Sequence, residues 1–161
     1  MELWDAYNSS FVKIENVTLV RGETIPKDIF HLVCDILVKH VDGTFLLMKR
    51  DLQKHFGGMW EATAGGSALI GENPLQCAIR ELKEETGIVS ANLVEVGREV
   101  SEETHSIYIE FLCITDWKKD KISFQQGETI DYKWVSKEEL LAMKHDELVT
   151  ERMQKYIDEL N

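Results

Sequence analysis

Cysteine is scarce in this chain, and its few copies are scattered. Cys34, Cys77 and Cys113 are odd in number and far apart, and the sequence contains no CxxC pair or Cys/His cluster. The pattern offers no zinc-binding group and fits a reducing cytoplasm better than an oxidising compartment. We expect each cysteine to be a small buried apolar residue rather than a catalytic thiol.

Long apolar runs are also missing. No stretch approaches membrane-spanning length, and the first residues, MELWDAYNSSF, contain acids where a signal peptide would be apolar. No internal repeat, low-complexity tract or Pro/Ser-rich linker divides the 161 residues, which is the size of one domain. We therefore expect one soluble, cytoplasmic domain over residues 1–161, with no membrane partner.

Basic residues are outnumbered. The chain has 18 Lys and Arg against 29 Asp and Glu, which gives a formal net charge of −11. A field of this sign repels a polyanion, so a nucleic-acid polymer is a poor candidate partner. A phosphorylated small molecule would need a divalent cation to approach these carboxylates.

The apolar pattern predicts a mixture of strands and helices. Residues 3–20 suggest two strands around the turn Asn8-Ser9-Ser10, and Asp42-Gly43 predicts a hairpin turn between strands at 30–40 and 44–50. Residues 55–66 suggest loop and short strand, because their glycines suit tight turns. Further strands are expected at 93–100, 106–115 and 130–135.

Capping residues locate the helices. Asn73 can cap a helix that has Pro74 in its first position and continues to Thr86, where Gly87 supplies a left-handed stop. A Ser136/Glu139 capping box predicts a second helix over 137–143, and residues 147–160 predict a terminal helix.

The first helix carries the densest chemical pattern in the sequence. From Gly66 to Ile88 the chain reads G-x5-E-x7-R-E-L-x-E-E-x-G-I, with Glu81, Glu84 and Glu85 on one helical face. Two such charges about 5 Å apart repel by roughly 3 kcal/mol at an effective dielectric near 20, and a divalent cation removes that penalty. Oxygen-only ligands favour Mg²⁺, with Mn²⁺ as the second choice. The simpler alternative is a solvated acidic face, partly paired with basic neighbours.

This motif resembles the Nudix box without a departure, and similarity to that family extends over residues 30–141. The resemblance implies an α/β/α sandwich with a mixed β-sheet, here with an N-terminal β-hairpin in an extension over 1–29 and a core over 30–161. It also implies hydrolysis of a diphosphate linkage, in a nucleoside diphosphate linked to another moiety or a related small molecule.

The resemblance further implies roles for individual residues. The positions of Glu81 and Glu85 bind metal in the family, that of Glu84 binds or orients it, and a carbonyl at Gly65 or Gly66 often joins them. The match of Arg80 orients a glutamate through an ion pair, and Glu72 supports the loop and the helix start.

The general base stays open between two residues. Some family members use the position of Glu81, whereas others use an acid from a later loop, for which Glu128 is the candidate. An ordinary exposed loop glutamate is an equally good interpretation of Glu128.

Candidate substrate contacts lie outside the motif. Arg50 and Lys54, with Lys49, could hold phosphate oxygens, although such residues are more often solvated. Trp60 and Tyr132 could stack on a planar group, although aromatic residues between strands are more often core. We interpret Trp134 as packing, and His31 and His105 as structural histidines without a metal-binding pattern.

Two other functions remain open. The segments WDAY and RGETIP-x3-FH resemble the branch that contains isopentenyl-diphosphate isomerases, but Gly65 and Ser67 stand where those enzymes have a cysteine and a histidine. A ligand sensor without turnover is the other alternative, although sensors commonly lose box glutamates. The sequence is compatible with a monomer or a homodimer, in which the N-terminal hairpin could serve as a dimer element.

Overall fold

The computed structural model describes residues 1–144 and 146–148 of the chain. These residues form nine strands and two helices, in the order β1 (Leu3–Tyr7), β2 (Lys13–Val20), β3 (His31–His40), β4 (Phe45–Arg50), β5 (Trp60–Glu61), β6 (Thr63–Ser67), α1 (Pro74–Thr86), β7 (Leu93–Ser101), β8 (Ser106–Thr115), β9 (Thr129–Val135) and α2 (Lys137–Leu141). In this part of the chain no helix is long and apolar enough to span a membrane.

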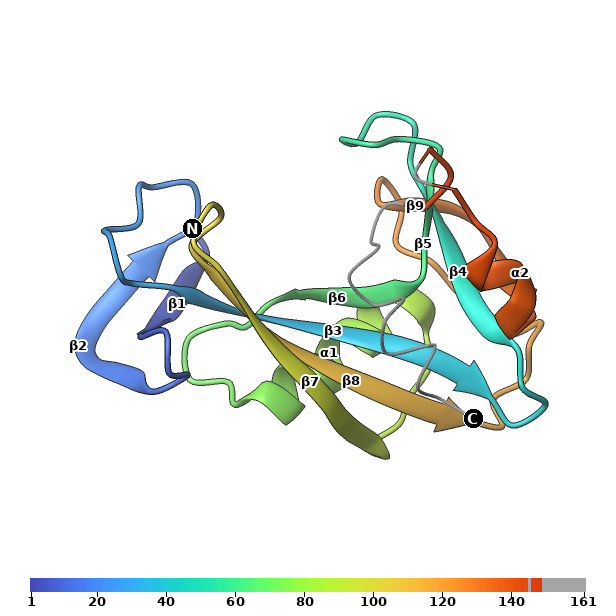
Figure 1. Ribbon diagram of the computed structural model, residues 1–161, viewed down its shortest axis with the longest axis horizontal. Helices are drawn as coiled ribbons and strands as arrows, with labels where there is room; N and C mark the ends of the chain where they lie inside the picture. Colours follow the sequence, from blue (N-terminus) through green and yellow to red (C-terminus); the bar gives the residue numbers. More distant parts are fainter. Residues whose placement is uncertain (145, 149–161) are drawn as a thin grey trace.

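Strand β3 is the central strand of a mixed seven-stranded sheet. It pairs with β8 in parallel along its whole length, from His31 to His40, and β8 pairs antiparallel with β7. On its other edge β3 pairs antiparallel with β6, while β4 joins it only through Lys39 and Phe45. Figure 1 shows β3, β6, β7 and β8 running through the middle of the molecule.

The sheet has a separate core on each face, because successive side chains of a strand point to opposite sides. Ile36 of β3 packs in one cluster with Cys77, Ala78 and Leu82 of α1. Its neighbour Leu37 packs in the other cluster, which includes Leu140 of α2. The expected α/β/α sandwich with a mixed sheet is therefore confirmed, and all three cysteines are buried.

The hairpin expected at Asp42-Gly43 forms, but its two strands soon separate. The Gly43 N–H donates to the His40 carbonyl at 2.9 Å, and Gly43 has a φ of 94°. Beyond the single pair nearest the turn, the edge of β3 is taken by β6, and β4 pairs instead with β9 and β5. The segment expected as loop and short strand thus supplies a sheet edge beside the helix that carries the box.

The N-terminal hairpin of β1 and β2 is seated on the loop that precedes α1 (Figure 1). The Leu3 carbonyl accepts from the Ile70 N–H at 2.9 Å, and Asp5 accepts from the Gly71 N–H at 2.8 Å. Trp4 stacks on His31 of β3, with ring centroids 4.2 Å apart. These contacts hold the ends of the hairpin close to the box.

Helix α1 begins and ends at the expected residues. The Asn73 side chain accepts from the Gln76 N–H, and the Gln76 side chain accepts from the Asn73 N–H, so the two form a capping box that the sequence interpretation did not include. Gly87 ends the helix with a φ of 81°. The second helix, α2, begins at the expected Ser136/Glu139 capping box.

The helix expected over residues 147–160 lies outside the described residues except for its first two positions. There, Leu148 forms a β-bridge with Trp60 and is buried in the core cluster that contains Leu37.

Candidate active site

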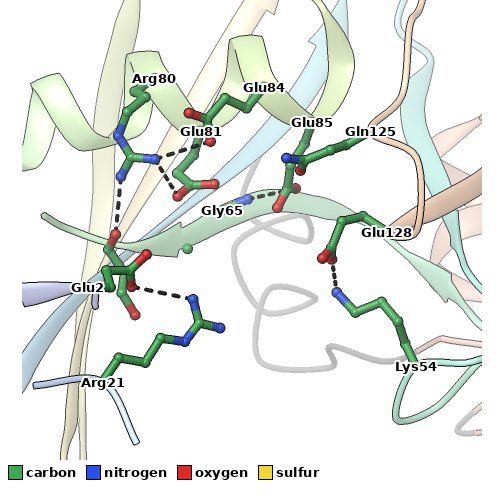
Figure 2. A pocket seen from close by; sticks show the side chains of 12 residues that line it. Glu2, Arg21, Lys54, Gly65, Arg80, Glu81, Glu84, Glu85, Gln125 and Glu128 are labelled. Carbon is green, nitrogen blue, oxygen red and sulfur yellow. Dashed lines mark hydrogen bonds and ion pairs between the residues drawn. The ribbon is translucent and has the colours of Figure 1, made fainter.

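A cavity of about 320 Å³ lies between the N-terminal hairpin, β6 and α1. Figure 2 shows it with Arg21 and Lys54 on opposite sides and the box glutamates between them. Its described lining residues are all charged, polar or glycine: Glu2, Arg21, Lys54, Gly65, Gly66, Ser67, Arg80, Glu81, Glu84, Glu85, Gln125 and Glu128.

Arg80 ties the helix to the loop before it. Its guanidinium donates to Glu72 at 2.7 and 2.9 Å, to Glu81 at 2.8 Å, to Glu84 at 3.2 Å and to the Ser67 carbonyl at 3.1 Å. The hydrogen bond to Glu72 raises the pKa of Arg80. Burial alone would raise the pKa of Glu72, but the bonds from Arg80 and from the Leu69 N–H lower it overall. Glu72 is thereby held as a carboxylate that supports the loop.

Glu85 points from α1 onto β6. Its carboxylate accepts from the Gly65 N–H at 3.1 Å. Burial, followed by the negative charges of Glu61 and Glu81, raises the pKa of Glu85 well above its ordinary value, and the Gly65 bond only partly opposes this. Glu85 therefore holds a proton more readily than an ordinary glutamate at the place where α1 faces the strand.

Glu81 lies beside Glu85 against the same strand. Its side chain is only 12% exposed and contacts the backbone of Gly66, where an added Cβ would come within 2.6 Å of Oε1. Burial raises the pKa of Glu81, Arg80 opposes the rise, and the charge of Glu84 adds to it. The first box position thus needs a glycine so that this carboxylate can reach the cavity.

The donor set suits a hard divalent ion, because it consists of oxygen atoms. Within residues 1–144 and 146–148, however, no three His, Cys, Asp or Glu side chains form a preformed metal-binding group. One nitrogen of Arg80 bonds to both Glu81 and Glu84, so a cation would compete with this guanidinium for their oxygens. The residues fit Mg²⁺ by chemistry and location, with a local rearrangement of side chains.

Glu128 lines the cavity opposite the helix. Its carboxylate pairs with Lys54, and its backbone carbonyl accepts from the Asp51 N–H at 2.9 Å. Gln125 precedes it in the same loop and also lines the cavity (Figure 2). The structure therefore brings the candidate base and a candidate phosphate-binding lysine together, 74 residues apart in the chain.

Arg50 lines a smaller cavity of about 100 Å³ that adjoins the first through Lys54, Gly65, Glu85 and Glu128. It donates to Glu61 of β5 at 3.0 Å and to the His55 carbonyl at 2.9 Å. Burial raises the pKa of Glu61, although Arg50 opposes the rise. The sequence interpretation did not single out Glu61, since a lone glutamate beside a tryptophan carries no motif.

The aromatic candidates do not line either cavity in the described structure. Trp60 lies between Lys49 and Lys133, whose Nζ atoms are 5.7 and 4.3 Å from its ring, and it packs on the second core cluster. Tyr132 packs on the first cluster near Phe124. Trp134 packs there too, as expected, and donates to the Lys119 carbonyl.

One wall of the cavity was not predicted from the sequence at all. Glu2 and Arg21 come from the two ends of the N-terminal hairpin, 19 residues apart, and their side chains pair at 3.3 Å. Ser67 completes this wall from the end of β6. No motif links Glu2 and Arg21 to the box, and only the seating of the hairpin places them beside it, whereas Ser67 directly follows Gly66 in the chain.

Both the sequence and the fold resemble those of known proteins. The NUDIX domain family model matches residues 30–160. An uncharacterized Nudix hydrolase of Listeria monocytogenes is 32% identical over 146 residues, covering 89% of this chain and 85% of the relative. An 8-oxo-dGTP diphosphatase of Proteus vulgaris is 33% identical over 91 residues, covering 55% of this chain and 75% of the relative.

A solved structure shares the fold over nearly the whole chain. The crystal structure of DR0079 from Deinococcus radiodurans matches with a TM-score of 0.76 and 17% identity, covering 98% of both chains, so the likeness includes the N-terminal hairpin. The chain belongs to the Nudix hydrolase family. It is a hydrolase that acts on pyrophosphate bonds, which are phosphorus-containing acid anhydrides.

Proposed function

We propose that the chain is a Mg²⁺-dependent hydrolase of the diphosphate linkage in a nucleoside diphosphate linked to another moiety, or in a related small molecule. The observation that carries this proposal is the convergence of Glu81, Glu84 and Glu85 on one cavity that also holds Lys54 and Arg21. Carboxylates suited to a cation and side chains suited to phosphate share a single site.

The oxygens that would hold Mg²⁺, or Mn²⁺ in its place, are the carboxylates of Glu81, Glu84 and Glu85 and the Gly65 carbonyl. When bound, the ion would supply charge neutralisation on the diphosphate and activation of the attacking water. Arg80 keeps two of these glutamates on the cavity side of the helix by pairing with Glu81 and Glu84.

In the reaction, a water oxygen forms a bond to one phosphorus while the bond from that phosphorus to the bridging oxygen breaks, and the other phosphate leaves with the bridging oxygen. Glu128 takes the proton from the attacking water in our proposal, with Glu81 as the second candidate. The ion pair with Lys54 supports Glu128, since it holds the carboxylate at the cavity. Arg50 and Lys54 would bind phosphate oxygens.

Trp60 and Tyr132 were proposed to stack on a planar part of the substrate. Their positions outside the described cavity linings favour packing roles instead. The proposal for substrate binding therefore depends on the charged residues.

The proposal also covers the domain organisation, the cellular location and the oligomeric state of the enzyme. We infer one domain over residues 1–161, working in the cytoplasm as a monomer or homodimer on a small-molecule diphosphate rather than a nucleic-acid polymer. The three buried cysteines without a disulfide and the net charge of −11 support the location and the choice of partner.

A screen of diphosphate compounds tests the function. Purified protein with Mg²⁺ or Mn²⁺ should release phosphate or a nucleotide from at least one class, and a chelator should abolish the release. Binding without turnover would favour a sensor, and an allylic rearrangement product would favour the isomerase alternative. Either outcome would overturn hydrolysis as the activity.

A further inference from the structure

Ser67 is held in place at both of its polar groups. Its backbone carbonyl accepts from Arg80, the residue that clamps the box glutamates, at 3.1 Å. Its hydroxyl lies 3.2 Å from Nδ1 of His31, a residue that is only 9% exposed. The side chain is therefore a fixed part of the cavity wall.

The hydrogen-bond chain behind Ser67 sets the direction of its hydroxyl. The Thr104 carbonyl can only accept, and we assign the single Ser106 hydroxyl hydrogen to it, at 3.2 Å. The Ser106 oxygen then accepts from His31 Nε2 at 2.8 Å, which leaves Nδ1 without a proton. Because Nδ1 is an acceptor, the hydroxyl hydrogen of Ser67 is committed to His31.

Ser67 therefore presents only oxygen lone pairs to the cavity. Glu2 adds acceptor capacity on the same wall. Its Oε2 receives the bonds from Trp4 Nε1 at 2.8 Å and from Arg21 at 3.3 Å, and within the described residues Oε1 is left for a ligand. A wall with these hydrogen-bond acceptors suits the hydroxyl groups of a ligand, because a hydroxyl can donate a hydrogen bond to them.

The rest of the lining excludes apolar groups. None of its described members is an aliphatic or aromatic side chain. An isoprenoid chain would find no apolar surface there, and a nucleobase would find no ring to stack on. The hydroxyls of a small hydroxylated group can donate to Ser67 and Glu2 and accept from Arg21.

We propose that Ser67 and Glu2 bind hydroxyl groups of a sugar or polyol that is esterified to the diphosphate. The inference rests on the proposed function, in which the metal ion held by Glu81, Glu84 and Glu85 would bind the diphosphate. It makes the substrate a sugar or polyol diphosphate ester rather than an alkyl or isoprenoid one, and it makes Ser67 a specificity-determining residue.

A matched pair of ligands tests the proposal. The uridine diphosphate esters of glycerol and of propan-1-ol share the nucleoside and the carbon chain and differ by two hydroxyls. Their methylene-bridged analogues resist hydrolysis, so calorimetry with Mg²⁺ measures their dissociation constants without turnover. The native protein should prefer the glycerol analogue by at least about tenfold.

Two variants test whether Ser67 and Glu2 cause the preference for the glycerol analogue. Ser67→Ala and Glu2→Gln should each reduce it to about threefold or less, whereas Ser10→Ala, in the exposed hairpin turn, should leave it unchanged. Thermal melting checks that each variant is folded. Equal affinity for the two analogues, or no binding of either, overturns the proposal. Absence of turnover on every diphosphate, with the preference intact, would contradict the proposed hydrolysis alone.

The tautomer of His31 provides a second test. Long-range ¹H–¹⁵N NMR spectra should show a proton on Nε2 and none on Nδ1 at neutral pH. A proton on Nδ1 would make Ser67 a donor to the cavity and would overturn its assignment as a hydroxyl acceptor.

Discussion

The Glu81 carboxylate lies so close to the backbone of Gly66 that an added Cβ would stand 2.6 Å from its Oε1. This contact explains why a glycine opens the box, since strand and helix must approach closely for the carboxylate to line the cavity. The surroundings of an added Cβ also distinguish Gly66 from its neighbour Gly65. A Cβ at Gly65 would instead clash with the backbone carbonyl oxygen of Cys34.

The first prediction uses this difference. Gly66→Ala should leave the fold nearly as stable, because the flexible end of Glu81 can move, but it should lower kcat/KM about tenfold or more by displacing that carboxylate. Gly65→Ala should lower the free energy of unfolding by about 2 kcal/mol, because the backbone of β3 cannot yield. Chemical denaturation and steady-state kinetics check both, and equal stability of the two variants would contradict the argument.

Glu85→Gln should lower Mg²⁺-dependent kcat/KM by about 100-fold or more, because a charged oxygen donor is lost from the proposed metal site. Activity is measured across a Mg²⁺ titration, and circular dichroism checks the fold. Glu95→Gln is the matched control, since Glu95 lies on β7 and pairs with Arg98 outside the cavity. Turnover near the native level would remove Glu85 from the metal site.

Glu128→Gln should lower kcat by about 100-fold with a much smaller change in KM, as expected for a group that moves a proton. Lys54→Met should raise KM as well, because it removes a proposed phosphate contact along with the partner of Glu128. If kcat of the Glu128 variant is unchanged, Glu128 is only a surface residue and Glu81 becomes the candidate base.

Arg80→Lys should reduce the free energy of unfolding by about 1–3 kcal/mol, since lysine cannot reproduce a guanidinium that bonds to three carboxylates and a carbonyl. Arg98→Lys removes a more exposed pair with Glu95 and should cost less than about 1 kcal/mol. Urea denaturation compares the two. A similar loss in both would show that the Arg80 network contributes little to stability.

Stability should fall on acidification because of His31. Burial, with smaller contributions from the charges of Arg21 and His105, lowers its pKa to about 4, although Glu2 opposes the shift. Around the ring, Trp4 stacks on one face and the hydroxyls of Ser67 and Ser106 contact the nitrogens. The neutral ring is the folded form, so its contribution is complete above the ordinary pKa near 6.5.

That contribution is lost as the pH falls from 6.5 through 4, because the unfolded chain then binds the proton more tightly. The loss reaches about 3 kcal/mol at full protonation. His31→Gln should show a shallower fall in the free energy of unfolding over this range, whereas His55→Gln, at an exposed position, should not. Identical pH profiles for the native and His31→Gln proteins would show that His31 does not produce the effect.

Most elements could be predicted because their signals are local. Alternating apolar residues and the caps at Asn73 and Ser136 depend on neighbours a few positions away. For the segment at 55–66 the glycines predict loop and short strand without bounds or a partner, and β6 takes its place because its backbone pairs with β3. That pairing joins segments that are far apart in the chain, so the local periodicity of apolar residues does not reveal it.

The sequence by itself determined the box: a helix of known start and end carries Glu81, Glu84 and Glu85 on one face, and helical geometry allows no other arrangement. Only the tertiary structure decided what surrounds it. Glu2, Arg21 and Ser67 meet because the hairpin docks beside β6, and Glu128 meets Lys54 because β9 pairs with β4. Contacts between residues so far apart depend on how strands and loops pack, which local sequence patterns do not encode.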